Sequence, residues 1–290
     1  MAWDHPIKDL DRDFDNLHFR SHEVDRAGTH ERRELWEKIF DGILPVRIRG
    51  AYWWTMGMTW DAIKLIGLEN LMLYMYDNPE GLKRLMAFLR DELIHLAQWL
   101  EREGLLTLNN ENDYTGSGSV GYTDDLPQKP RGEAESACLK DQWVLLESQE
   151  TVGVGPKQFE EFVFPYQAAV GNLFGKCYYG CCEPVHNRWH ILKKMPNLSR
   201  VSISPWADEA FMAEALGQDY VYSRKPLPTL VSTEVFDEKA IRQDIVKTLS
   251  IAKDCRVELI MKDVHTLNNQ PERLARWVEI AREVIEEIHG

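Results

Sequence analysis

The stretch KCYYGCCEPVH, at residues 176–186, is the part of this sequence whose residue types point most directly to chemistry. It holds three of the five cysteines, including the adjacent pair Cys181 and Cys182, and continues with Glu183 and His186. Thiolate, carboxylate and imidazole groups together are the donors from which zinc sites are made. Free cysteine on a strand is also common as a small buried apolar residue. The residues alone leave both readings open, a metal site and plain core packing.

A second polar cluster, LNNENDY, lies at residues 108–114 and contains Asn109, Asn110, Glu111 and Asp113. A carboxylate held in a pocket acts as a general acid or base once burial raises its pKa. Glu111 and Asp113 are therefore candidate catalytic residues. A solvated loop acid or a helix cap is the alternative interpretation of Glu111.

Three basic residues, Arg224, Lys225 and Lys262, follow two predicted neighbouring strands and would attract an anionic group such as a carboxylate. Ordinary surface charge is the alternative, and Lys262 could equally pair with the adjacent Asp263.

Three tryptophans, Trp53, Trp54 and Trp206, could form the walls of a site for an aromatic or flat substrate. Tryptophans with no further evidence are more often part of the core.

Alternating strands and helices are predicted to position these side chains. The expected elements of the second half are a helix at 188–195, a strand at 200–204, a helix at 208–216, a strand at 220–223, a helix at 238–252, a strand at 256–261 and a helix from Pro271 to about 287. This rhythm predicts βα units and a parallel sheet.

The first half is less regular. Residues 1–44 are predicted to be a charged N-terminal helical extension, with Thr29 capping a helix in HERRELWEKIF. The expected elements after it are a strand at 44–52, a helix from Trp60, a helix from Pro79 to Gly104, a strand at 105–109, an irregular connection over 110–135, a strand or excursion at 142–146 and a helix around 159–166.

The predicted fold is therefore a single α/β domain over residues 45–290, with about six recognisable βα units. Polar residues close its strands in series, as at the carboxyl-end face of a βα-barrel, where active sites are built. A complete barrel has eight strands, so the expected fold is a TIM-type (β/α) barrel that is incomplete.

Composition excludes several classes of protein. The net charge of −13 without any run of Lys or Arg argues against a nucleic-acid surface. No apolar stretch approaches the roughly 18 residues of a membrane span, and the acidic start MAWDHPIKDLDRDFD is not typical of a signal peptide. Five cysteines, two of them adjacent, do not form a disulfide framework. A reduced, soluble, cytoplasmic protein is expected.

From about residue 44 onward the chain resembles the uroporphyrinogen decarboxylase-like superfamily, which includes zinc-dependent, cobalamin-linked methyltransferases. The matching segments are GAYWWTMGMTWDAI, GLENLMLYMYDNPEGLKRLM, LLTLNNENDY, CYYGCCEP, RVSISPWAD, DYVYSRKP and ELIMKDVHT. The resemblance implies a βα-barrel whose first two strands are absent or displaced, so that another chain could complete it.

The resemblance also implies site residues. Cys181 matches a zinc-binding cysteine of the methyltransferases, Tyr179 stands where they have a histidine, and His265 stands near their late ligand position. The implied zinc ligands are Cys181 and His265, with Glu111 or Glu183, while Cys182 is expected to face outward. Tyr179 joins Glu111 and Asp113 as a catalytic candidate.

Three functions follow as expectations. The first is a zinc-dependent methyltransferase that moves a methyl group between a small methylated substrate and a corrinoid carried by a partner protein. The second is a cofactor-free decarboxylase of an aromatic or tetrapyrrole-like acid, in which Asp113 or Glu111 manages protons while Arg224 or Lys262 holds a carboxylate. The third is a non-catalytic barrel remnant that serves as a subunit or binding module.

Overall fold

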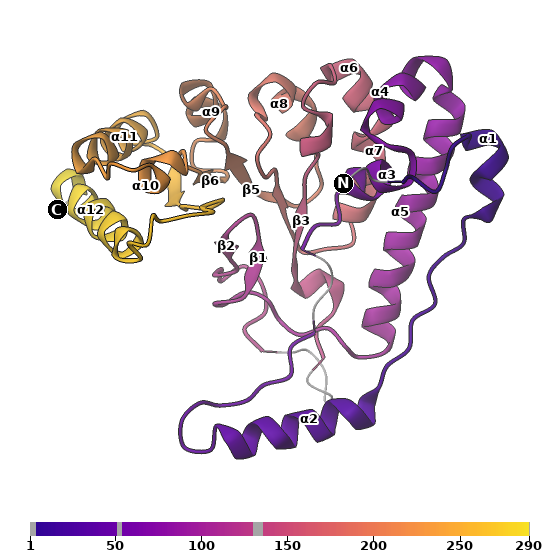
Figure 1. Ribbon diagram of the computed structural model, residues 1–290, viewed down its shortest axis with the longest axis horizontal. Helices are drawn as coiled ribbons and strands as arrows, with labels where there is room; N and C mark the ends of the chain where they lie inside the picture. The colour runs from indigo at the N-terminus through magenta and orange to yellow at the C-terminus, as the bar shows by residue number, and fades with distance from the viewer. Residues whose placement is uncertain (1–3, 51–53, 130–135, 290) are drawn as a thin grey trace.

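A five-stranded parallel sheet forms the centre of the molecule in a computed structural model that describes residues 4–50, 54–129 and 136–289 (Figure 1). Its strands are β3 (Trp143–Leu146), β4 (Lys176–Tyr179), β5 (Leu198–Ile203), β6 (Val221–Arg224) and β7 (Arg256–Leu259). Their spatial order, β3-β4-β5-β6-β7, is also their order along the chain. The predicted α/β class with a parallel sheet is confirmed.

The sheet is open at both ends. Within the described residues, β3 and β7 each pair with one strand only, so a closed barrel is not seen. Strands that follow one another in sequence and in space are nevertheless the arrangement found in a βα-barrel, whereas a doubly wound sheet reverses its order at a switch point.

Strands were predicted at 44–52 and 105–109. The structure describes residues 44–50 and 105–109 of these segments, and no strand occurs in either of them, so the prediction was wrong there. These segments run beside each other and along β3 with irregular contacts. The side chain of Asn109 bonds to both the backbone N–H and the carbonyl of Trp143, and Gly50 N donates to Thr107 Oγ1 at 3.2 Å. Side-chain hydrogen bonds thus take the place of the backbone hydrogen bonds that would join neighbouring strands. For this reason the apolar, strand-like segments 44–50 and 105–109 do not extend the sheet.

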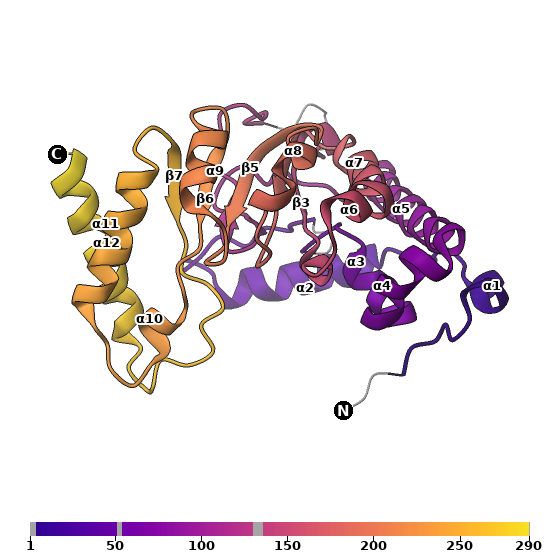
Figure 2. The same ribbon diagram turned by 90° about the horizontal axis from the view of Figure 1, so that it is seen from above.

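Helices cover one face of the sheet. Their bounds are α3 (Thr59–Ile66), α4 (Leu68–Asp77), α5 (Pro79–Arg102), α6 (Pro156–Phe162), α7 (Phe164–Gly171), α8 (Trp189–Leu192), α9 (Glu209–Leu216), α10 (Thr229–Ser232), α11 (Glu238–Ile251) and α12 (Glu272–His289). Figure 2 shows α11 and α12 beyond β7 at one end, and α5 with α7 at the other. No helix among the described residues is both long and apolar enough to span a bilayer.

The long helix α5 begins and packs as its sequence predicts. Asn78 caps it by accepting a hydrogen bond from Gly81 N, and Pro79 occupies its first turn. Its buried face includes Leu82, Leu85, Met86, Leu89 and Leu93, which recur at helical spacing. This face joins the main core and holds the N-terminal half of the chain against the sheet.

The N-terminal segment is helical, as expected, in α1 (Leu10–Asp13), a 3₁₀ turn η1 (Phe14–Asn16) and α2 (Arg26–Ile39). Asp25, not Thr29, caps α2, by accepting a hydrogen bond from Gly28 N. No residue of α2 is buried, and Figure 1 shows this helix lying apart from the sheet. Arg26 pairs with Glu103 at the end of α5, across 2.9 Å.

A small hairpin covers the sheet face that the helices leave free. It consists of β1 (Tyr114–Gly116) and β2 (Ser119–Val120), which lie in the connection expected to be irregular. Trp143 Nε1 donates to Gly121 O at 2.9 Å, and Leu145 lies against Gly116. The hairpin thereby covers part of the sheet face opposite the helices.

Replacing Gly121 by alanine is expected to destabilise the fold by about 1–3 kcal/mol. A Cβ at this position would lie 1.8 Å from the backbone oxygen of Asn109, which cannot rotate away. Urea unfolding measures the change, and Gly153→Ala is the matched control, because its Cβ would meet only Met72 Cε at 3.7 Å. Equal stability of the two variants would contradict the close approach of the hairpin to residues 109–110.

Candidate active site at the carboxyl ends of the strands

The two adjacent cysteines come together just beyond β4. The strand ends at Tyr179, and Gly180 turns the chain with a φ of 96°, a conformation that favours glycine. The sulfurs of Cys181 and Cys182 lie 3.6 Å apart. The expectation that Cys182 faces outward was wrong, because strand alternation no longer applies once the chain has turned.

Lys262, which follows β7, brings a positive charge to both sulfurs. Its ammonium lies 3.1 Å from Cys181 Sγ, 3.4 Å from Cys182 Sγ and 3.0 Å from Asp263 Oδ2. Asp263 also lies 3.4 Å from Cys182 Sγ. Of the alternatives raised for Lys262, the ion pair with Asp263 is present; its contact with the two cysteines was not predicted from the sequence.

This environment makes Cys181 the more acidic thiol. The hydrogen bond from Cys182 and the charge of Lys262 outweigh burial and lower the pKa of Cys181 to about 6. The same hydrogen bond and burial raise the pKa of Cys182, and the neighbouring thiolate raises that of Lys262 against the effect of burial. The cluster thus holds one thiolate, one thiol and one ammonium near neutral pH.

The rate at which iodoacetamide alkylates Cys181 is expected to rise through about pH 6. In Lys262→Met this midpoint moves to higher pH, because the thiolate loses its positive neighbour. Peptide-resolved mass spectrometry measures the rate, and Lys239→Met in α11, an exposed lysine, is the control. An unchanged midpoint in Lys262→Met would show that the ammonium does not stabilise the thiolate.

Glu183 fixes the backbone around this cluster. It is fully buried, and its carboxylate accepts hydrogen bonds from Cys181 N and Ser148 N, each at 2.9 Å. Ser202 on β5 donates to Cys181 O at 2.9 Å. The turn that carries the thiolate is therefore tied to the ends of both neighbouring strands.

A second buried acid, Glu147, was not singled out from the sequence. It follows β3 and accepts a hydrogen bond from Thr55 Oγ1 at 3.2 Å. Burial, and then the charges of Glu183 and Glu150, raise its pKa well above the usual value. The environment thus favours the protonated form of Glu147.

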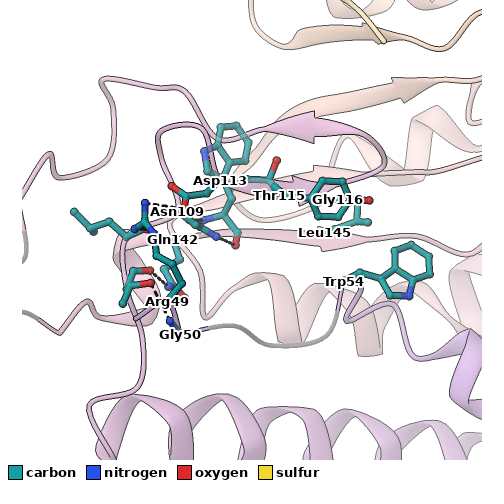
Figure 3. A pocket seen from close by; sticks show the side chains of 13 residues that line it. Arg49, Gly50, Trp54, Asn109, Asp113, Thr115, Gly116, Gln142 and Leu145 are labelled. Carbon is teal, nitrogen blue, oxygen red and sulfur yellow. Dashed lines mark hydrogen bonds and ion pairs between the residues drawn. The ribbon is translucent and has the colours of Figure 1, made fainter. Parts of the chain in front are cut away.

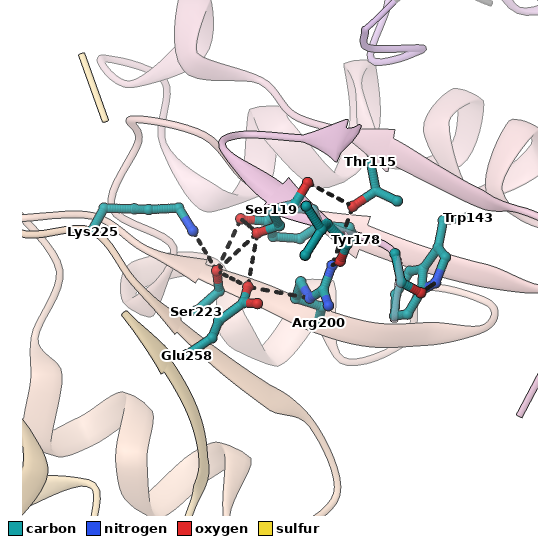
Figure 4. Close-up of polar contacts among 10 residues, drawn as sticks. Thr115, Ser119, Trp143, Tyr178, Arg200, Ser223, Lys225 and Glu258 are labelled. Carbon is teal, nitrogen blue, oxygen red and sulfur yellow. Dashed lines mark hydrogen bonds and ion pairs between the residues drawn. The ribbon is translucent and has the colours of Figure 1, made fainter. Parts of the chain in front are cut away.

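A polar network lies on the hairpin side of the sheet (Figure 4). Ser119 of the hairpin contacts Tyr178, Ser223 and Glu258 on three different strands, at 2.8–3.4 Å. Arg200 on β5 lies 3.2 Å from Glu258 and donates to Val120 O. The predicted strand began at Arg200, but β5 begins two residues earlier, at Leu198. A charged residue inside a strand, once its bounds are known, indicates that this face is polar.

Lys225 ends in the same network, where its ammonium donates to Ser223 Oγ. Burial alone would raise the pKa of Tyr178, but the charge of Lys225 and hydrogen bonds from Lys225 and Ser119 bring it below its usual value. Lys225 is fully buried, and its ammonium lies within the network on the hairpin side of the sheet.

A cavity of about 310 Å³ lies beside the hairpin (Figure 3). Trp54 and Trp143 contribute aromatic surface to its lining, and Arg49 pairs with Asp113 in it across 3.0 Å. Asn109 and Thr115 add polar groups. An aromatic wall beside a charged pair suits a small, flat, polar molecule.

The chain matches no protein-family model. It also matches no curated protein.

The structure separates the predicted site residues into groups. Cys181 and Lys262 come together, and Asp113 and Trp54 share the cavity. Trp53 lies outside the described residues, and Trp206, Glu111 and His265 are exposed.

Two predicted site residues lie on the other face of the sheet. Tyr179 is buried against α7, where its hydroxyl donates to Gln167 Oε1 at 2.9 Å. Arg224 is buried towards α9 and pairs with Glu209 across 3.0 Å. Alternation along β4 and β6 places both side chains towards the helices, which corrects their assignment to catalysis and substrate binding.

Zinc needs three or four donors. In the described part of the chain, no group of three or more His, Cys, Asp or Glu side chains is placed to hold a metal ion. His265 and Glu111 are exposed, and the ammonium of Lys262 already neutralises the Cys181 thiolate. The predicted ligand set of Cys181, His265 and Glu111 therefore does not fit zinc.

Proposed function

We propose that the protein is a methyltransferase in which the thiolate of Cys181 attacks the methyl group. The observation that carries this proposal is the contact of Cys181 Sγ with the ammonium of Lys262, at 3.1 Å, beyond the carboxyl ends of parallel strands. A thiolate at that position is an activated nucleophile, and this edge of a βα fold is where active sites are built.

The step is a displacement at carbon. A sulfur–carbon bond forms between Cys181 and the methyl group, and the leaving group departs with the electron pair of the bond that breaks. The methyl group stays on Cys181 as a thioether, so each chain accepts one methyl group. Lys262 keeps the sulfur deprotonated before attack, and the buried carboxylate of Glu183 orients the turn that carries it. The corrinoid protein implied by the family resemblance is the proposed partner, since a methylcorrinoid releases its methyl group to thiolates.

Methylcobalamin is the probe for this reaction. Incubation with the protein should add one methyl group to the peptide that contains Cys181, with the visible spectrum of the corrinoid changing in step. The reaction should persist in the presence of a chelator, because the described residues assemble no metal site. Methylation confined to the exposed Cys138, or absent, would refute the proposal.

We propose further that the sheet belongs to a βα-barrel of the uroporphyrinogen decarboxylase-like kind whose first part is irregular. Its support is the sequential strand order and the position of the hairpin over the inner face.

The cavity beside the hairpin favours a second candidate, a cofactor-free decarboxylase of an aromatic acid. Arg49 would hold the carboxylate and Asp113 would manage the proton, in a cavity whose lining includes Trp54. A volume of about 310 Å³ is at the small end of ligand pockets, so a single-ring acid suits it better than a tetrapyrrole.

Carbon dioxide release from a panel of single-ring aromatic acids tests this candidate. Asp113→Asn should abolish the release while leaving the methylation of Cys181 unchanged. No release from any acid, or equal release by Asp113→Asn, would remove it.

A further inference from the structure

Cys181 and Cys182 are placed for chemistry with each other as well as with a substrate. Their sulfurs are in van der Waals contact at 3.6 Å, and both lie within 3.4 Å of one ammonium. Of the remaining cysteines, Cys177 is buried against the helices, Cys138 is exposed and Cys255 lies near Ala213 O. In methyl transfer Cys182 acts only through its hydrogen bond to Cys181, and its own sulfur forms no new bond.

We propose that Cys181 and Cys182 form a vicinal dithiol that low-molecular-weight disulfides oxidise reversibly to a disulfide, making this turn a site of thiol–disulfide exchange. The effect of that exchange on catalysis rests on the proposed methyltransferase function, whereas the exchange itself does not.

The exchange balances in two steps. The thiolate of Cys181 attacks one sulfur of oxidised glutathione, a sulfur–sulfur bond forms, and one glutathione thiolate leaves with the electron pair. Cys182 then loses its proton and attacks Cys181 Sγ, which expels the second glutathione thiolate. Starting from one thiolate and one thiol, the protein loses two electrons and one proton, and oxidised glutathione becomes two thiolates, which take up that proton and one from the solvent.

The surroundings support each step. Lys262 stabilises the attacking thiolate, and Asp263, 3.4 Å from Cys182 Sγ, is positioned to accept the proton of the second thiol. Cys181 is buried, with an exposed fraction of 7%, whereas Cys182 is half-buried, so the pair meets the surface through Cys182. Gly180 and the loss of strand geometry after Tyr179 let the two side chains turn to the same side.

The bond should be easy to reverse. Adjacent residues have Cα atoms about 3.8 Å apart, closer than the roughly 4.4–6.8 Å of ordinary disulfides. The ring that closes is therefore strained, and strained disulfides are reduced readily. Such a bond suits a switch and not a structural cross-link.

The experiment uses the full chain, treated with oxidised glutathione and analysed by peptide mass spectrometry without reduction. The wild-type peptide that contains both cysteines should lose the mass of two hydrogen atoms and retain no glutathione. In Cys182→Ser the same peptide should keep glutathione on Cys181, because no neighbour expels it. Cys138, which is exposed and has no cysteine beside it in the sequence, is the internal control and should keep glutathione in both proteins.

Two outcomes overturn the proposal: glutathione retained on Cys181 in the wild type, and no reaction at Cys181 while Cys138 reacts. Circular dichroism shows that Cys182→Ser is folded before the comparison.

Methylation by methylcobalamin, measured before oxidation, after it and after reduction, separates the two proposals. Methylation that is lost on oxidation and recovered on reduction supports both proposals. A disulfide without any methylation in the reduced protein refutes the methyltransferase alone, and methylation without a disulfide refutes the exchange alone.

Discussion

Cys181→Ser should lower the rate of methyl transfer from methylcobalamin by roughly 10⁴-fold. Serine keeps the size of the side chain, but its hydroxyl stays protonated at neutral pH, whereas the pKa of Cys181 is about 6. Lys262, 3.1 Å from the sulfur, cannot compensate, because it stabilises an anion that serine does not form.

Single-turnover methylation, followed in the corrinoid spectrum, measures this loss. Cys138→Ser is the matched control, since it makes the same chemical change at an exposed cysteine. Retention of the wild-type rate in Cys181→Ser would exclude a nucleophilic role, and the cavity that holds Asp113 would then become the first candidate active site.

Arg224→Met should destabilise the protein by about 3 kcal/mol, the low end of the range for a broken buried ion pair. The arginine side chain is only 4% exposed and holds Glu209 of α9 across 3.0 Å. Its removal leaves that carboxylate with Lys247 at 3.1 Å and Thr248 at 2.8 Å, which is why the loss stays near the low end.

Urea unfolding of the variant and of Arg242→Met provides the comparison. Arg242 pairs with Glu283 and Glu287 on the surface, and its side chain is 36% exposed, so its loss should cost at most about 1 kcal/mol. A smaller loss for Arg224→Met than for Arg242→Met would contradict the buried pair.

The stability that Arg224→Met loses should also depend on pH. Burial raises the pKa of Glu209, but Arg224, Thr248 and Lys247 together bring it below its usual value. The stability from this carboxylate is therefore present above its unfolded-state pKa and is lost as the pH falls through the lower folded-state value. The difference between wild type and Arg224→Met should shrink over that range.

The regular half of the fold was predictable because its signals are local. Alternating apolar strands and capped helices predicted β5, β6, β7 and α11 near their observed positions, and Asn78 with Pro79 predicted the start of α5. The irregular contacts along β3, at one edge of the sheet, were not predictable from local signals. Asn109 bonds to the backbone of Trp143, 34 residues away, and no local pattern encodes that choice.

The site was predictable in composition but not in geometry. The residue types in KCYYGCCEPVH pointed to a reactive turn, yet the direction of Cys182 depends on Gly180 leaving the strand. Arg224 and Tyr179 point to the helix side of the sheet, away from the predicted site. The face that a strand residue occupies depends on the register of the whole sheet. Arg49 reaches Asp113 only through tertiary contacts, so no local pattern marked Arg49 as a candidate site residue.

The sequential strand order has a consequence for how the chain folds. Each strand from β3 to β7 pairs only with its neighbours in sequence, so every pairing closes one short βα loop of the chain. Parallel pairing is slow because each pairing must first close a crossover loop. Here each crossover spans only one βα unit, so the sheet can grow from β3 as later strands leave the ribosome. The last strand to arrive, β7, carries Lys262 just beyond its end, so the thiolate acquires its counterion only when the sheet is complete.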